Sequence, residues 1–198
     1  MNLPQYLALD NLPVLVLCVL LLVAAAIDFW KLKVPNRLTF PMIVSGWLLG
    51  LCLPGPGDVW ANLGGLGASF VLTLFGLALL LPVYAIGGMG AGDVKMQMGF
   101  GAWVGAIYGL GEGFWIVLYG FCLAAVVGGV IAAGMMVWRG DFFANRKNVA
   151  EIVRDWFTSA GVHDVAAKAA RRKPRLHLLP YGVPLCIGFI GYLLLRGF

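Results

Sequence analysis

Two aspartates lie at the edges of apolar segments, where a charged side chain is costly. Asp28 closes an apolar run in AAIDFWKLKVPN, and Asp93 follows a glycine-rich stretch in GGMGAGDVKMQMG. Acids that border membrane-spanning segments are candidates for function, because the bilayer does not solvate them. The remaining acids need no such explanation, since they fall in expected outer loops or among basic residues (Asp10, Asp58, Glu112, Asp141, Glu151, Asp155 and Asp164).

A pair of carboxylates that share one site can hydrolyse a peptide bond without a metal or another cofactor. Both cannot ionise cheaply at short range, so one keeps its proton and the pair divides into a base and an acid. The ionised group takes a proton from water, and the protonated group polarises the scissile carbonyl. Asp28 and Asp93 belong to different helices at similar expected depth, so a helical bundle can bring them together.

Two other classes of protein are compatible with these acids. In a transporter or channel subunit, Asp28 and Asp93 would form a relay for protons or cations, and the glycine-rich fourth span would favour that role. Relay sites usually lie near the membrane midplane, however, and both acids are expected at the membrane boundary. In a structural membrane subunit the acids would only cap helices, and Asp28→Asn and Asp93→Asn would leave function intact.

Two glycines, Gly90 and Gly92, lie just before the second acid. Glycine lets a chain turn and lets another backbone approach closely, so these positions would admit an extended substrate. Close helix packing is the structural alternative. The GxGD pattern carries little weight alone, because this chain contains it again at 55–58. We interpret that second match, which ends in Asp58, as a decoy in a turn on the opposite side of the membrane.

Composition indicates an integral membrane protein. Of the 198 residues, 61% are apolar and 12% are charged, whereas about half and about a quarter are usual in soluble domains. We expect an all-α fold in a single membrane-embedded domain, residues 1–198. The four cysteines lie inside apolar runs and form no CxxC, so we interpret them as apolar filler rather than as zinc ligands or disulfides.

Charge-free runs predict six transmembrane helices, each near the roughly 20 residues that a bilayer requires. The expected ranges are roughly 11–29, 38–54, 63–85, 95–110, 114–138 and 178–196. The first could pass for a signal peptide. However, no basic residue precedes it, and the acidic Asp10 does, so we expect an uncleaved span. The last holds Pro180 and Pro184 in its first turns, where proline costs little.

Basic residues set the expected orientation, because they are enriched in cytosolic loops. All 14 basic residues except Arg196 fall in or beside the odd-numbered loops. We therefore expect N- and C-termini outside, and both candidate acids at the cytosolic boundary of the inner (plasma) membrane. The same distribution accounts for the net charge of +5 without any nucleic acid.

The one long polar segment, 139–177, lies between the fifth and sixth expected spans. Apolar residues recur there at helical spacing, which predicts an amphipathic cytosolic helix on the membrane or across the bundle (Val149, Ile152, Val153, Trp156 and Phe157). We interpret the basic run RRKPR at 171–175 as a contact with anionic lipid that anchors the topology, and a specific protein contact is the alternative.

Taken together and in order, these residues resemble the type IV prepilin peptidases, which are membrane aspartic proteases of the GxGD kind. Asp28 followed by VPN at 34–36 is similar to the family's D…IPN segment. GAGDVKM at 90–96 is similar to its GxGD-V-K-L segment, and LPYGVP at 179–184 to its P-[YF]-xx-P segment. With six spans, the resemblance covers nearly the whole chain, and the combination is specific although no single piece is.

The resemblance implies a catalytic dyad of Asp28 and Asp93, with no metal or other cofactor. It also implies a set of residues that shape the loop, the turn after the first span and the site (Gly90, Gly92, Pro35, Asn36 and Lys95). For Lys95 an equally open alternative to a role in the site is that its side chain, at a helix end, extends toward the membrane surface.

The activity that the resemblance implies is removal of a short basic leader from prepilins or pseudopilins, just before their hydrophobic helix. Long bifunctional family members carry paired CxxC motifs that are linked to N-methylation of the new N-terminus. Here the first loop is short and the sequence has no CxxC. The chain therefore looks similar to the short, peptidase-only branch that serves tight-adherence (Flp-type) pili, and an archaeal preflagellin-type substrate is the alternative.

Overall fold

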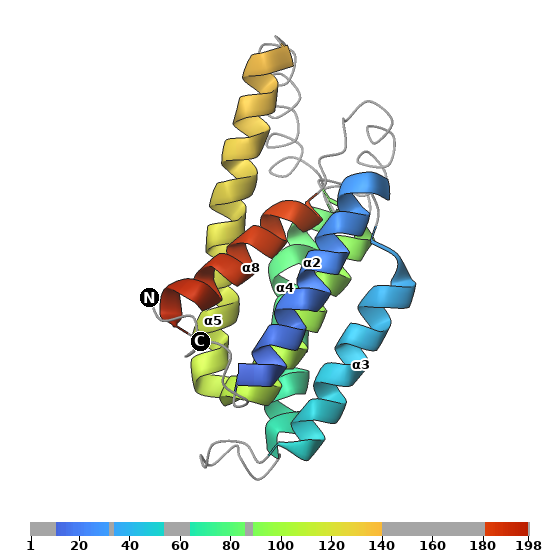
Figure 1. The fold of residues 1–198 in the computed structure, drawn as a ribbon, viewed down its shortest axis with the longest axis vertical. Coiled ribbons are helices and arrows are strands. Elements are labelled where there is room, and N and C mark those ends of the chain that lie inside the picture. Colours follow the sequence, from blue (N-terminus) through green and yellow to red (C-terminus); the bar gives the residue numbers. More distant parts are fainter. Residues whose placement is uncertain (1–10, 32–33, 54–63, 86–88, 140–180, 198) are drawn as a thin grey trace, which may run out of the picture.

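The computed structural model describes residues 11–31, 34–53, 64–85, 89–139 and 181–197. All the regular elements in this part of the chain are helices, as the sequence predicts. They pack side by side in a bundle that α8 crosses obliquely (Figure 1). The helices are α2 (Leu12–Lys31), α3 (Asn36–Cys52), α4 (Gly64–Ala85), α5 (Ala91–Arg139) and α8 (Gly182–Arg196).

Within the described ranges, three segments are long and apolar enough to cross a membrane: Leu12–Lys31, Gly65–Ala85 and Ala91–Met135. The other two helices are shorter, with 17 residues in α3 and 15 in α8. Observed and expected starts differ by about four residues at α8, which begins at Gly182 rather than near residue 178, and at α5, which begins at Ala91 rather than near residue 95. The polar side chains of this first turn are accommodated there, because Asp93 accepts a backbone N–H and Lys95 bonds a neighbouring helix.

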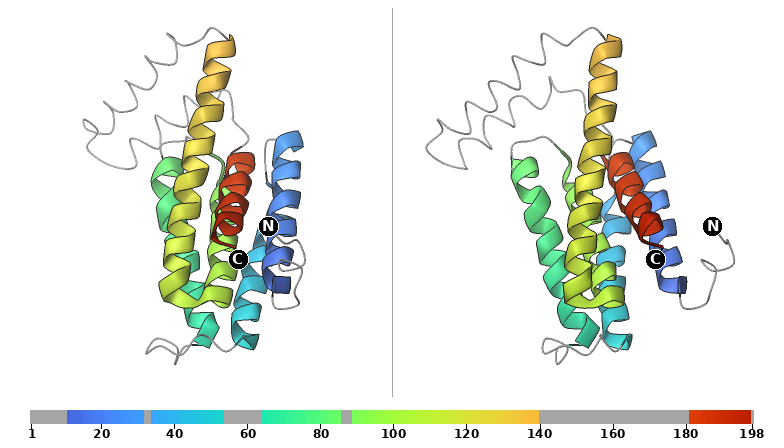
Figure 2. Two further views of the ribbon diagram at one scale, coloured as in Figure 1. Left: turned by 60° about the vertical axis from the view of Figure 1, so that its left-hand side comes forward. Right: turned by 90° about the vertical axis from the view of Figure 1, so that its left-hand side faces the viewer.

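α5 reverses direction at Gly109, whose φ of 73° and ψ of −171° lie outside the helical region. Glycine adopts a positive φ without steric cost. A Cβ added to Gly120 would lie 3.7 Å from the Phe100 ring, whereas a straight helix would hold residues 100 and 120 about 30 Å apart. The two halves therefore lie against each other, as Figure 2 shows. Residues 95–110 and 114–138, expected as separate helices, occupy these two antiparallel halves.

Glycines bring the first half of α5 directly against the backbone of α4. A Cβ on Gly105 would lie only 2.6 Å from the carbonyl oxygen of Ala68, so no side chain fits there. Ser69 reinforces the contact by donating a 2.5 Å hydrogen bond to the Ala102 carbonyl. Close packing of small residues and buried hydrogen bonds are the interactions that hold helices together in lipid.

α8 packs on the other side of α5 through aromatic rings. The rings of Phe100 and Phe189 stack with centroids 4.0 Å apart and planes 5° from parallel. Both side chains are fully buried. This stack fixes α8 beside the first half of α5, which carries Asp93 in its first turn.

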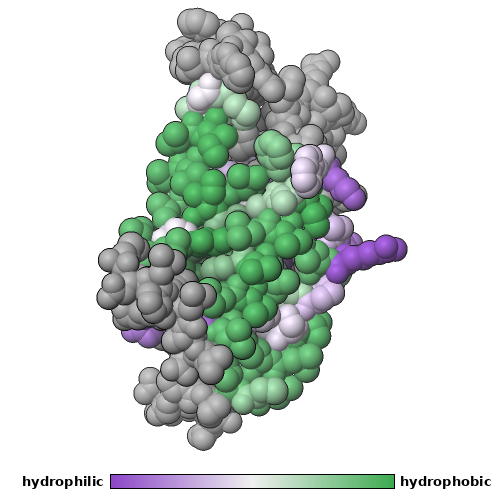
Figure 3. All heavy atoms as spheres, in the orientation of Figure 1, coloured by the Kyte–Doolittle hydropathy of each residue, from purple (hydrophilic) through white to green (hydrophobic). Residues whose placement is uncertain are grey.

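The outer surface of the bundle is apolar over most of the face shown in Figure 3. Large apolar side chains stand exposed on several helices, among them Val19, Leu22, Leu48, Val130 and Leu195. Soluble monomers rarely expose apolar surface on this scale. Together with the long apolar helices, the surface agrees with the prediction of a membrane protein.

The bundle has two distinct ends. At one end, beside the reversal of α5, Arg196 forms an ion pair with Glu112. At the other end α2 terminates and α5 begins, which places Asp28 and Asp93 at the same end (Figure 1).

Some predictions fall on residues outside the described ranges. These are Asp10, the second GxGD match at 55–58, Pro180, and the polar segment after Arg139 with its expected amphipathic helix and basic run.

Candidate active site

Asp28 lies in the last turn of α2 and is only 3% exposed. Its Oδ2 accepts a 2.8 Å hydrogen bond from the backbone N–H of Gly182, the first residue of α8. The first N–H groups of a helix have no partner within that helix, so they are free to bind a carboxylate. Asp28 is thereby tied to a segment that follows it by 154 residues.

Asp93 lies in the first turn of α5 and is 5% exposed. Its Oδ2 accepts a 3.2 Å hydrogen bond from the N–H of Gly90, and its own N–H donates to the Gly90 carbonyl. The other carboxylate oxygen, Oδ1, is buried and has no hydrogen-bond partner among the described residues. A buried polar atom without a partner is rare in folded proteins and needs an explanation.

The fold brings the two acids into one site, as a dyad requires. The Asp28 carboxylate is near enough to act electrostatically on Asp93. The start of α8 lies next to both, because Gly182 binds Asp28 and Tyr181 lies within electrostatic range of Asp93. Burial raises the pKa of Tyr181, and the Asp93 charge raises it further.

The two glycines before Asp93 have different surroundings. A Cβ on Gly92 would lie 2.7 Å from the Val34 carbonyl oxygen, so the start of α5 rests on the segment that follows α2. A Cβ on Gly90 would lie 3.3 Å from Oδ2 of Asp93. We expected both glycines to admit a substrate backbone, but at Gly92 the close approach is made by Val34.

The expected turn residues form a second link to α5. Pro35 is the N-cap of α3, with φ of −73° and ψ of 143°. Asn36 then begins the helix, and its Oδ1 accepts a 2.8 Å hydrogen bond from Nζ of Lys95. Lys95 also lies 4.6 Å over the ring of Phe40. The structure thus directs Lys95 to α3, two residues after Asp93 in the sequence.

The sequence reasoning missed Gln97, one helical turn after Asp93. Its side chain is fully buried, and both Oε1 and Nε2 lack a hydrogen-bond partner in the part of the chain that the structure describes. Residues four apart share one face of a helix. A signal was available, since Gln97 is an amide inside an otherwise apolar span, at that spacing from Asp93.

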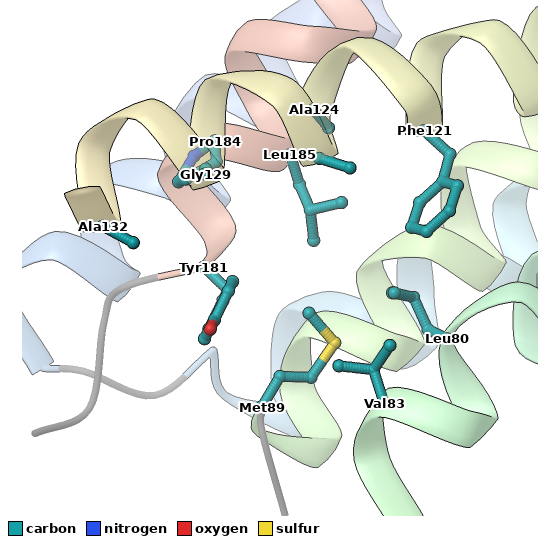
Figure 4. Close-up of a pocket in the computed structure, with 12 residues that line it drawn as sticks. Leu80, Val83, Met89, Phe121, Ala124, Gly129, Ala132, Tyr181, Pro184 and Leu185 are labelled. Carbon is teal, nitrogen blue, oxygen red and sulfur yellow. The ribbon is translucent and has the colours of Figure 1, made fainter. Parts of the chain in front are cut away.

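An apolar cavity of about 260 Å³ lies beside the site. It is lined by the end of α4, the second half of α5 and the start of α8 (Figure 4). Small residues on α5, including Ala125, Gly129 and Ala132, form one wall. Tyr181 and Met89 also line the cavity, and each directly precedes a glycine that donates its N–H to one of the acids.

No group of three or more histidine, cysteine, aspartate or glutamate side chains is arranged to hold a metal ion within the described ranges. All four cysteines lie in those ranges and are free thiols.

The chain is similar to known proteins over the segment that carries both acids. A model of the type IV leader peptidase family matches residues 15–133. Two proteins named prepilin leader peptidase/N-methyltransferase, from Burkholderia pseudomallei strains 1026b and K96243, are each 30% identical to it over 131 residues. That match covers 63% of this chain but only 37% of each relative. No solved structure matches the chain.

Proposed function

The chain belongs to the type IV leader peptidase family, and from this premise we propose that it is a membrane aspartic endopeptidase. Its reaction is removal of the leader peptide from type IV prepilins or pilin-like proteins. The observation that carries the proposal is the convergence of two buried carboxylates, Asp28 and Asp93, beside the start of α8. No other pair of acids in the described residues is buried in this way.

In the proposed mechanism one carboxylate is ionised and the other is protonated. The ionised aspartate takes a proton from a water molecule as the water oxygen attacks the scissile carbonyl carbon. The protonated aspartate donates a hydrogen bond to the carbonyl oxygen, where negative charge develops. The carbon–nitrogen bond then breaks, and the leaving amine receives a proton from the dyad. The products are the leader with a new carboxylate and the mature protein with a new amino terminus.

Helix capping alone accounts for less of the geometry. Both acids do accept a backbone N–H near a helix start, as a capping residue would. Capping does not require two acids from different helices to share a site, and it leaves the buried Oδ1 of Asp93 without a purpose. The family match further disfavours a proton or cation relay.

We infer six membrane spans within one domain, with the termini outside and the dyad at the cytosolic boundary of the inner membrane. The reversal of α5 at Gly109 supports this count, because it supplies two antiparallel spans from one continuous helical segment. Lys31 and Lys95 near the dyad fit a cytosolic end, where basic residues are enriched.

The proposed substrate has a basic leader followed by a hydrophobic helix. The apolar cavity supports this class, because Met89 and Tyr181 place its apolar wall next to the acids. The segment after the scissile bond would lie along the second half of α5, against Ala125 and Gly129. The proposal concerns the leader peptidase reaction, which the relatives' names include.

Reconstitution in lipid vesicles tests the proposal. The full chain is incubated with a prepilin-like substrate, and the products are identified by mass spectrometry. We expect one cut between the leader and the hydrophobic helix, and no cut in a control substrate whose leader is deleted. An intact substrate, combined with proton or cation flux through the same vesicles, would contradict the peptidase and favour a relay.

A further inference from the structure

Gly182 is the residue through which α8 contacts the candidate dyad. Its backbone N–H donates a buried 2.8 Å hydrogen bond to Oδ2 of Asp28. Because Gly182 opens α8, the positive end of the helix dipole also faces this carboxylate. The family match ends at residue 133, so α8 lies beyond the matched segment.

The contact requires glycine because of space. A Cβ at position 182 would lie 2.8 Å from Oδ2, 2.9 Å from Cβ and 3.0 Å from Cγ of Asp28. The carboxylate itself occupies the volume that a side chain would need. Backbone conformation is not the reason, since the positive-φ glycines of the described chain are Gly109 and Gly197.

We propose that Gly182 is a positioning residue for Asp28, an inference that rests on the proposed peptidase function. The N–H holds one carboxylate oxygen, and the absence of a side chain lets the carboxylate lie against the helix start. Tyr181, the preceding residue, lies within electrostatic range of Asp93. Gly182 thus holds Asp28 in place, and the start of α8 orients this acid in addition to closing the bundle.

The first test compares two glycine-to-alanine variants of the same helix. Gly182→Ala places a methyl group in the volume of the Asp28 carboxylate. Gly191→Ala is the matched control, because its Cβ would lie 3.5 Å from Cδ2 of Leu123, an ordinary contact. We expect Gly182→Ala to lower kcat about 10- to 100-fold. The added methyl group displaces the carboxylate from its hydrogen bond, and the free energy of one hydrogen bond to a charged group corresponds to this factor in rate. KM stays near the wild-type value because the substrate-binding surface is unchanged, and Gly191→Ala cleaves like the wild type.

The second test removes the hydrogen bond without adding volume. Incorporation of glycolic acid at position 182 of the full chain, by nonsense suppression during in vitro synthesis, replaces the N–H with an ester oxygen. We expect a similar fall in kcat, measured well below the thermal midpoint, which itself falls because a buried hydrogen bond to a carboxylate is lost. If Gly182→Ala fails to fold, the ester variant decides the question.

The two proposals fail in distinguishable ways. Full kcat in the ester variant, with cleavage abolished in Asp28→Asn, would overturn the role of Gly182 and leave the peptidase intact. A wild-type chain that cleaves no prepilin-like substrate would overturn the peptidase, and with it this inference.

Discussion

The Nζ of Lys95 donates a 2.8 Å hydrogen bond to Oδ1 of Asn36, across 59 residues of sequence. The bond joins the first turns of α5 and α3, and Asp93 lies two residues before the lysine. With Val34 against Gly92, it fixes the helix start that carries the second acid. A charged residue at this position thus stabilises a tertiary contact.

The Lys95–Asn36 bond predicts coupled effects on stability. Lys95→Met and Asn36→Ala should each lower the free energy of unfolding by about 0.5–1 kcal/mol, since the bond is exposed to solvent. The double variant should cost little more than either single one, because both remove the same interaction. Asn36→Asp keeps an acceptor for Lys95 and serves as the control. Thermal unfolding in detergent measures these effects, and fully additive losses would show that the two residues act independently.

Narrowing the apolar cavity should weaken substrate binding. Nothing lies within 4 Å of a Cβ added to Gly129, so Gly129→Leu adds apolar bulk to the cavity without an internal clash. We expect KM to rise about tenfold with little change in kcat, because that factor corresponds to about 1.4 kcal/mol of lost apolar contact. Gly134→Leu is the control, since position 134 on the same helix is equally open but does not line the cavity. Equal KM values in the two variants would exclude the cavity from substrate binding.

Gln97→Met should separate stability from activity. The buried amide has no partner among the described residues, and an unpaired buried polar group costs about 1–3 kcal/mol. A methionine of similar volume removes that cost, so the thermal midpoint should rise. If the amide is retained to bind the substrate backbone, cleavage should fall in the same variant. A stabilised variant with full cleavage would remove Gln97 from the site.

Tyr181 predicts a loss of stability at alkaline pH. Burial and the nearby Asp93 charge raise the pKa of its hydroxyl above 10. The folded protein therefore favours the neutral hydroxyl, whereas the unfolded chain ionises freely above about pH 10. Stability is fully present below that pH and falls as the pH rises toward the folded-state pKa. Tyr181→Phe should flatten this fall in thermal midpoints measured against pH, and the exposed Tyr119→Phe should not. An identical fall in both variants would contradict this assignment.

Hydropathy and charge predicted much of the fold, because in a bilayer each span must satisfy its own backbone hydrogen bonds. The apolar runs correspond to α2, α3, α4, the two halves of α5, and α8. Asp28 and Asp93 were recognised as candidate site residues because they are acids at the ends of those runs, where a bilayer does not solvate a charge. Each of these inferences depends only on local composition.

Contacts between distant segments were beyond such reasoning. The bond from Gly182 to Asp28 joins residues 154 positions apart, and a glycine in a glycine-rich chain gives no signal of its own. The packing of Val34 against Gly92 depends on the path of the segment that connects α2 to α3. Gln97 differs, because its polarity within an apolar run was visible and only its burial was not.

The central claim is that Asp28 and Asp93 act together as a catalytic dyad. Its most direct test is leader cleavage by the reconstituted wild type and by Asp28→Asn, Asp93→Asn and Asp58→Asn. We predict that each of the first two variants loses about 10²- to 10⁴-fold in rate, the usual contribution of a general acid or base. Asp58→Asn, in the second GxGD match, should cleave like the wild type. Cleavage that survives in Asp93→Asn at the wild-type rate would contradict the dyad.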